Sequence, residues 1–294
     1  MTHPLDLVLT LVSRDGDVAG LASTAPGRTG GVADRSAADW SVAETGVAGG
    51  ADLVAWLEAE APARGADWAI TPAANRRKGL LISDMDSTII GQECLDELAD
   101  FAGLKAEVSA ITERAMRGEL DFAGALTQRV AMLKGLSISA LEACHAERVR
   151  LNAGARELVA TMKAHGARAV LVSGGFGYFT SRVAAMAGFD ADRANRLIDD
   201  GAALTGAVGQ PILGREAKLT ALLEETAARG LTAGDALALG DGANDLDMIC
   251  AAGLGVAYKA KPIVAAQTRA RIEHTDLRAA LFFQGYAVSE IARA

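Results

Sequence analysis

The feature that most restricts the fold is a regular alternation of short apolar runs and amphipathic stretches, which begins at residue 80. Strands are expected at residues 80–83, 169–172, 236–239 and 255–258. Helices are expected at residues 153–165, 178–187, 216–228 and 245–251. Such alternation is typical of βαβ units, in which parallel strands form a sheet covered by helices. The sequence therefore predicts an α/β fold built on a parallel sheet.

One segment interrupts this pattern and another precedes it. Residues 93–150 have the pattern of consecutive helices with no strand between them, which predicts a helical cap inserted into the sheet domain. Residues 72–79 are basic and bounded by Pro72 and Gly79, so a domain boundary is expected near residue 75. The predicted domains are a small N-terminal α+β domain at residues 1–75 and a larger domain at residues 76–294.

The N-terminal region is only partly interpretable. Strands are expected at residues 5–12 and 67–70, and a helix at residues 51–59. Between them, residues 13–50 are rich in Gly, Ala, Ser, Thr and Asp and show weak periodicity. No element can be assigned there from the pattern.

Two carboxylates follow the first strand of the larger domain. Asp84 and Asp86 stand at positions i and i+2, directly after a run that is expected to be buried. Side chains at the carboxyl end of a parallel strand lie at the crevice where α/β sheets bind ligands. Turn formation is the alternative, since Asp is common in loops. A calcium-binding EF-hand is excluded, because Ile89 and Leu95 stand where its loop needs Gly and Glu.

A second acidic loop follows a later strand. The stretch Gly240-Asp-Gly-Ala-Asn-Asp245 brings Asp241 and Asp245 to another strand end. Several carboxylates without histidine or thiolate suit a hard cation bound by oxygen, and Mg²⁺ is the usual choice beside phosphate. This loop alone is also compatible with ordinary turn chemistry.

Two further motifs gain a functional interpretation only together with these loops. Ser173 and Gly174 end a strand and open a helix, where exposed N–H groups and a hydroxyl can bind an anion. An ordinary helix start is the alternative. Lys218 lies early in a predicted helix, and a lone lysine is usually a solvated surface charge.

The four motifs, in this order, resemble the haloacid dehalogenase superfamily of phosphohydrolases, whose fold is a Rossmann-like sheet with an inserted cap. The resemblance covers about residues 80–284. It implies that Asp84 is the nucleophile and Asp86 the general acid and base, and that Lys218 neutralises an aspartyl phosphate. It also implies a Mg²⁺ cofactor held by Asp84, Asp86, Asp241 and Asp245. The expected phosphoryl and substrate contacts are Ser173, Gly174, Lys218 and Asn244.

Within that superfamily, the cap is similar to the phosphoserine phosphatases, which release L-serine from O-phospho-L-serine. The resemblance implies that Glu93 binds the substrate amino group, that Arg129 binds its carboxylate, and that Met116 and Phe122 line and close the cap. Each has an alternative: Glu93 as a helix cap, Arg129 in a surface ion pair, and the two apolar residues as core. Another small phosphomonoester is the alternative substrate, and a non-catalytic amino-acid sensor is the rival from a different class.

The same resemblance suggests that residues 1–75 form a diverged ACT-like domain. A dimerisation or packing element is the alternative, so a homodimer is one expectation.

The chain has 29 Lys and Arg against 37 Asp and Glu, a formal net charge of −8. This charge disfavours nucleic acid and anionic membranes as partners. No apolar run approaches the length of a membrane span, and a cytoplasmic location is expected.

Overall fold

The structure is a computed structural model that describes residues 6–116 and 119–293. Its centre is a parallel sheet of six strands in the order β12-β11-β10-β5-β6-β7. Their bounds are β5 (Leu80–Ser83), β6 (Arg168–Phe176), β7 (Ala191–Asn195), β10 (Ala236–Gly240), β11 (Leu254–Tyr258) and β12 (Ala270–Ile272). The predicted α/β class with a parallel sheet is confirmed.

Both faces of this sheet are buried, which explains why its strands are continuous apolar runs. Alternate residues of β5 pack into two separate cores: Leu81 into one, and Leu80 and Ile82 into the other. The surrounding helices are α7 (Ala155–Ala164), α8 (Gly177–Ala187), α9 (Arg215–Ala227), α10 (Leu246–Ala251), α11 (Pro262–Ala265) and α12 (Ala279–Phe283).

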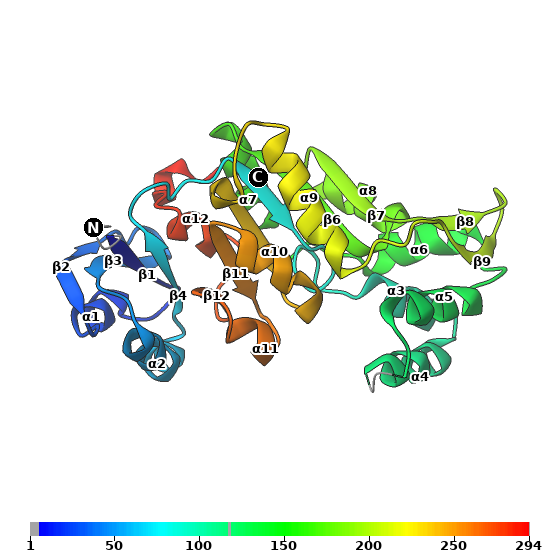
Figure 1. The fold of residues 1–294 in the computed structure, drawn as a ribbon, viewed down its shortest axis with the longest axis horizontal. Helices are drawn as coiled ribbons and strands as arrows, with labels where there is room; N and C mark the ends of the chain where they lie inside the picture. Colours follow the sequence, from blue (N-terminus) through cyan, green and yellow to red (C-terminus); the bar gives the residue numbers. More distant parts are fainter. Residues whose placement is uncertain (1–5, 117–118, 294) are drawn as a thin grey trace.

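The segment between β5 and α7 contains helices, as expected for the insertion. They are α3 (Cys94–Phe101), α4 (Lys105–Met116), α5 (Phe122–Met132) and α6 (Ile138–Arg148). Asp121 and Ser137 fix the starts of α5 and α6, because their side chains accept hydrogen bonds from Gly124 N and Ala140 N. A hairpin of β8 (Leu197–Asp199) and β9 (Leu204–Val208) lies beside these helices, at the end of the molecule opposite the N-terminal strands (Figure 1).

The N-terminal region contains more structure than its sequence pattern predicts. Its elements are β1 (Leu7–Ser13), α1 (Val18–Ser23), β2 (Arg28–Asp34), β3 (Ser41–Val47), α2 (Ala51–Glu60) and β4 (Asp67–Pro72). The strands pair antiparallel in the order β2-β3-β1-β4, which is a ferredoxin-like βαββαβ arrangement. The ACT-like assignment stays a prediction.

The N-terminal strands and the parallel strands form one sheet. Strand β4 pairs antiparallel with β12, through Ala69 with Ala270 and Trp68 with Arg271, so that ten strands are continuous. This pairing joins segments about two hundred residues apart in the sequence, and no local sequence pattern predicts it. The domain boundary near residue 75 stays a prediction. The structure shows that the segments on either side of it contribute strands to one continuous sheet.

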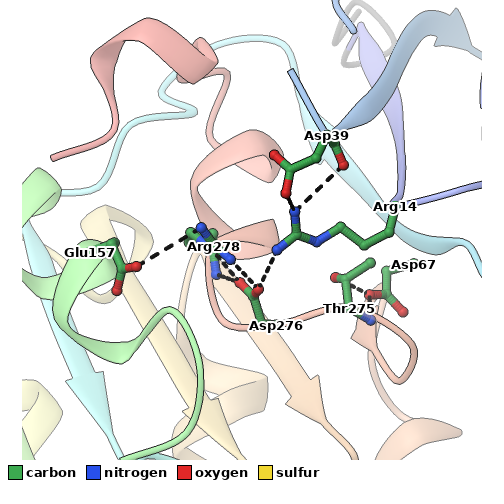
Figure 2. A network of polar contacts seen from close by, with 7 residues as sticks. All are labelled: Arg14, Asp39, Asp67, Glu157, Thr275, Asp276 and Arg278. Carbon is green, nitrogen blue, oxygen red and sulfur yellow. Dashed lines mark hydrogen bonds and ion pairs between the residues drawn. The ribbon is translucent and has the colours of Figure 1, made fainter. Parts of the chain in front are cut away.

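Polar contacts reinforce this junction (Figure 2). Asp67, at the start of β4, accepts hydrogen bonds from the backbone N–H groups of residues 273, 274 and 275 and from Thr275 Oγ1. Nearby, Arg14 pairs with Asp39 and with Asp276, and Asp276 in turn binds Arg278 at 2.7 Å. Burial disfavours a charged Asp276, but hydrogen bonds from Arg278 hold the pKa of this carboxyl below its ordinary value.

In the described residues, no helix has the length and apolar character needed to cross a membrane.

Because Asp67 accepts four hydrogen bonds at the junction of β4 with the parallel strands, it should contribute far more to stability than an exposed acid of the same network. Asp67→Ala leaves backbone donors without a partner, and we expect the free energy of unfolding in urea to fall by about 2–3 kcal/mol. The control is Asp39→Ala, whose side chain is 73% exposed and should cost less than about 1 kcal/mol. Equal losses in the two variants would contradict this role of Asp67.

Candidate active site

The polar residues predicted from the sequence gather where three neighbouring parallel strands end. Asp84 follows β5 directly, Asp241 follows β10, and Ser173 and Gly174 lie near the end of β6. The three strands are adjacent in the order β10-β5-β6, so their carboxyl ends share one edge of the sheet. This topology brings together residues that are more than 150 positions apart in the sequence.

Lys218, on the first turn of α9, forms ion pairs with Asp84 and with Asp245. Its Nζ lies 2.8 Å from Asp84 Oδ1 and 2.5 Å from Asp245 Oδ1, and its side chain is 2% exposed. Burial alone would lower the pKa of Lys218, but the two carboxylates raise it above its ordinary value. The lysine is therefore a buried cation paired with two carboxylates, and not a solvated surface charge.

Asp84 is a buried carboxyl in a strongly charged setting. Burial and the charge of Asp245 raise its pKa, while Lys218 acts in the opposite direction. Its Oδ1 accepts hydrogen bonds from Lys218 Nζ and Met85 N. Within the described part of the chain, no hydrogen bond occupies Oδ2.

Asp86 has the properties of a group that gains and loses a proton. Its Oδ1 accepts from Cys94 N at 3.0 Å, and its Oδ2 accepts from Ser173 Oγ at 3.4 Å. Burial and the charge of Glu93 raise the pKa of Asp86 to about 7. Such a value suits a general acid and base near neutral pH.

Three acids can hold a metal ion. Asp84, Asp241 and Asp245 each offer a carboxylate oxygen, and these oxygens lie within 4.8 Å of one another. Burial and the charge of Asp245 raise the pKa of Asp241 to about 6, because neighbouring carboxylates disfavour one another's charge. Asp86, also predicted as a ligand, is not in this group, since its oxygens face Cys94 and Ser173.

Nine of the predicted site residues line one cavity of about 160 Å³. They are Asp84, Asp86, Glu93, Phe122, Arg129, Ser173, Gly174, Asp241 and Asn244. Lys218 and Asp245 lie beneath it. Lys218 forms ion pairs with Asp245 and with Asp84. The side chain of Met116 lies outside the described residues. The cavity is smaller than the roughly 300–1,000 Å³ of drug-sized sites, so it suits a small ligand.

The cap supplies this cavity with charges of opposite sign. Arg129 Nε is buried and has no hydrogen-bond partner among the described residues, and burial lowers the pKa of this guanidinium. Glu93 stands at the start of α3, but its side chain does not cap the helix; it accepts a hydrogen bond from Ser87 Oγ. Phe122 is 41% exposed and is not a core residue. The alternatives of helix cap, surface ion pair and core therefore do not describe these three residues.

Two neighbouring features were not predicted. Lys261 and Leu126 also line the cavity; the basic stretch Lys259-Ala-Lys261 after a strand was the available signal for the lysine. A larger cavity of about 790 Å³ lies on the other side of Phe122. It contains none of the clustered aspartates, so the chemistry belongs to the smaller one.

Comparison with known proteins decides the family. The family model for haloacid dehalogenase-like hydrolases matches residues 81–249, which is more than half of the chain. The chain belongs to the haloacid dehalogenase-like hydrolases. A phosphoserine phosphatase from Polaromonas sp. is 48% identical over 203 residues, which cover 67% of this chain and 86% of that protein. Within these hydrolases the chain therefore belongs to the phosphoserine phosphatase family.

Solved structures agree with this assignment. A HAD family hydrolase from Salmonella enterica serovar Typhi has a TM-score of 0.85 at 29% identity and covers 94% of this chain and 98% of its own. This likeness to a fellow haloacid dehalogenase-like hydrolase therefore extends over the N-terminal elements. A phospho-aspartyl intermediate analogue of phosphoserine phosphatase has a TM-score of 0.64 at 39% identity and covers 70% of this chain and 99% of its own.

Proposed function

We propose that the protein is a Mg²⁺-dependent phosphoserine phosphatase that hydrolyses O-phospho-L-serine to L-serine and phosphate, the last step of serine biosynthesis. The observation that supports this substrate is that Glu93 and Arg129 line the same cavity as Asp84 and Asp86. A carboxylate matches the guanidinium fork, and an ammonium complements the glutamate. The phosphoserine phosphatase relatives support the same substrate.

The reaction begins at Asp84. Its Oδ1 is fixed by Lys218 and Met85 N, which leaves Oδ2 to attack phosphorus. As the P–O ester bond breaks, Asp86 gives its proton to the serine oxygen, and the phosphoryl group remains on Asp84. Asp86 then takes a proton from water, whose oxygen attacks phosphorus, and the bond to Asp84 breaks to release phosphate. Ser173, the Gly174 backbone and Asn244 bind phosphoryl oxygens.

Mg²⁺ fits the three-carboxylate cluster, because every donor is an oxygen. When bound, it supplies positive charge that reduces the repulsion between the carboxylates and the phosphate. Asp84, Asp241 and Asp245 would hold it, and Asp86 stays a predicted fourth member of the set. Lys218 supplies positive charge from the buried side.

Two alternatives are tested by simple assays. Turnover of phosphoserine is compared with that of sugar phosphates and phosphoglycolate, since equal rates would favour a phosphatase of another small phosphomonoester. A non-catalytic sensor would show no turnover at all, and the joined set of Asp84, Asp86, Ser173 and Lys218 counts against it. A cytoplasmic location, a homodimer and a regulatory N-terminal domain are retained as parts of the proposal.

Selectivity should depend on Arg129. Arg129→Ala should lower kcat/KM for phosphoserine by about 100-fold or more, since a charged contact in a closed site is lost. Hydrolysis of para-nitrophenyl phosphate, which lacks the carboxylate, should change little. The control is Arg114→Ala, which changes an exposed arginine of the same cap. Equal losses on both substrates would show that Arg129 only supports the cap.

The two steps should separate when Asp86 is changed. Asp86→Asn should slow phosphoserine turnover by about 100-fold or more, because serine needs a proton to leave. Nitrophenolate leaves without one, so para-nitrophenyl phosphate should give a rapid burst of about one product per site, followed by slow hydrolysis of the aspartyl phosphate. Stopped-flow absorbance measures both phases. Steady release of nitrophenolate at the rate of the unmodified protein, without a burst, would refute the role assigned to Asp86.

Metal binding should raise thermal stability. Mg²⁺ added to metal-free protein should increase Tm, because a ligand of the folded state stabilises it by mass action. Asp241→Asn should abolish most of that increase. Asp247→Asn, at an exposed acid that pairs with Arg215, should leave it unchanged. An undiminished increase in the Asp241 variant would place the ion elsewhere.

A further inference from the structure

Lys261 occupies a fixed position at the edge of the catalytic cavity. It follows β11 and immediately precedes α11, whose first residue is Pro262. Its N–H donates to the carbonyl oxygen of Asp241 at 3.0 Å, and its own carbonyl accepts from Val264 N and Ala265 N. The backbone of this lysine is thus tied both to the acidic loop and to a helix start.

The side chain of Lys261 is a cation with no partner of its own. It lines the cavity together with Asp84, Asp241 and Asn244. In the part of the chain that the structure describes, no hydrogen bond or ion pair engages its ammonium group. By contrast, Lys218 is already shared between two buried carboxylates.

The charge balance of the cavity shows why a cation is needed there. Among the described residues, four carboxylates line it, from Asp84, Asp86, Glu93 and Asp241, and two cations, from Arg129 and Lys261. A phosphate monoester adds further negative charge. Arg129 comes from α5 in the cap, whereas the backbone of Lys261 is hydrogen-bonded to Asp241. Among the described residues, Lys261 is therefore the lining cation that is joined to the acidic loop. Its charge also lowers the pKa of Asp241, after burial and neighbouring acids have raised it.

We infer that the ammonium group of Lys261 contacts a phosphoryl oxygen of the bound substrate, and of the phosphate product, from the exposed rim of the cavity. Lys218 then stabilises the same group from the buried floor, through Asp84. This inference rests on the proposed phosphoryl transfer in this cavity, but not on serine as the leaving group. Lys261 is a substrate-binding residue in this assignment, because it touches the phosphoryl group itself.

The chain offers a matched control two residues away. Lys259 lies on the same loop and is exposed; its ammonium lies 5.5 Å from the Tyr258 ring, and it does not line the cavity. We therefore compare Lys261→Ala, Lys261→Arg and Lys259→Ala with the unmodified protein. Since both lysines are exposed, all three variants should fold with unchanged Tm.

The experiment measures binding and turnover separately. Calorimetric titration with inorganic phosphate in Mg²⁺ should show binding about tenfold weaker or more for Lys261→Ala. kcat/KM should fall by a similar factor for phosphoserine and for para-nitrophenyl phosphate, because both carry the phosphoryl group. Lys261→Arg should restore most of each loss, and Lys259→Ala should stay within about twofold of the unmodified protein.

Several results would overturn the inference. A loss confined to phosphoserine would assign Lys261 to the substrate carboxylate. Unchanged phosphate affinity with a changed Mg²⁺ requirement would assign it to the metal cluster, and behaviour like Lys259→Ala would make it a solvated surface charge. The proposed function fails in a different way: the unmodified protein would then not prefer phosphoserine, while phosphate binding would still test Lys261.

Discussion

The site depends on the double ion pair of Lys218 with Asp84 and Asp245. Removing one partner of a buried ion pair costs about 3–5 kcal/mol, so these three groups must be buried together or not at all. They come from three places in the fold: the end of β5, the 3-10 turn Ala243–Asp245 between β10 and α10, and the start of α9. The pair therefore fixes α9 against the sheet edge, and it orients Asp84 so that one oxygen is held and the other stays open.

Backbone hydrogen bonds connect the N-terminal strands to this same edge. Ile70 N, in β4, donates to Arg269 O beside β12; Lys259 N, after β11, donates to Ile272 O; and Lys261 N donates to Asp241 O. The two loops that carry Asp241 and Lys261 are thus supported by a sheet that continues into the first 72 residues. Loss of the β4 to β12 pairing would expose a sheet edge next to the Lys261 loop. The N-terminal region is consequently part of the scaffold of the site, whatever else it binds.

The sequence was most informative where the determinants are local. Asp84, Ser173 and Asp241 each follow an apolar run, so strand ends and their polar residues could be found together. The Gly-rich β2, exposed along almost its whole length, lacks the alternation that marks a half-buried strand, and α1 is only six residues long. The β4 to β12 pairing and the position of Lys261 depend on tertiary contacts, so periodicity could not reveal them. Arg129 and Glu93 could be assigned only by family resemblance, because a charged residue on a helix has the same pattern at the surface and in a pocket.

The Phe122 ring packs against the chain at two glycines. A Cβ on Gly174 would lie 3.3 Å from Phe122 Cζ, which is tighter than most Cβ contacts, and one on Gly214 would lie 3.6 Å from Phe122 Cδ1, an ordinary contact distance. The ring therefore approaches the end of β6 and the start of α9 closely, and it separates the cavity of about 160 Å³ from the larger one beyond it. A compartment this small, which the described residues line with four carboxylates and two cations, favours a compact, highly charged molecule over a bulky apolar one. In the proposed function, the cap would therefore select substrates by volume through Phe122 and by charge through Arg129 and Glu93, while the strand ends would act on the phosphoryl group.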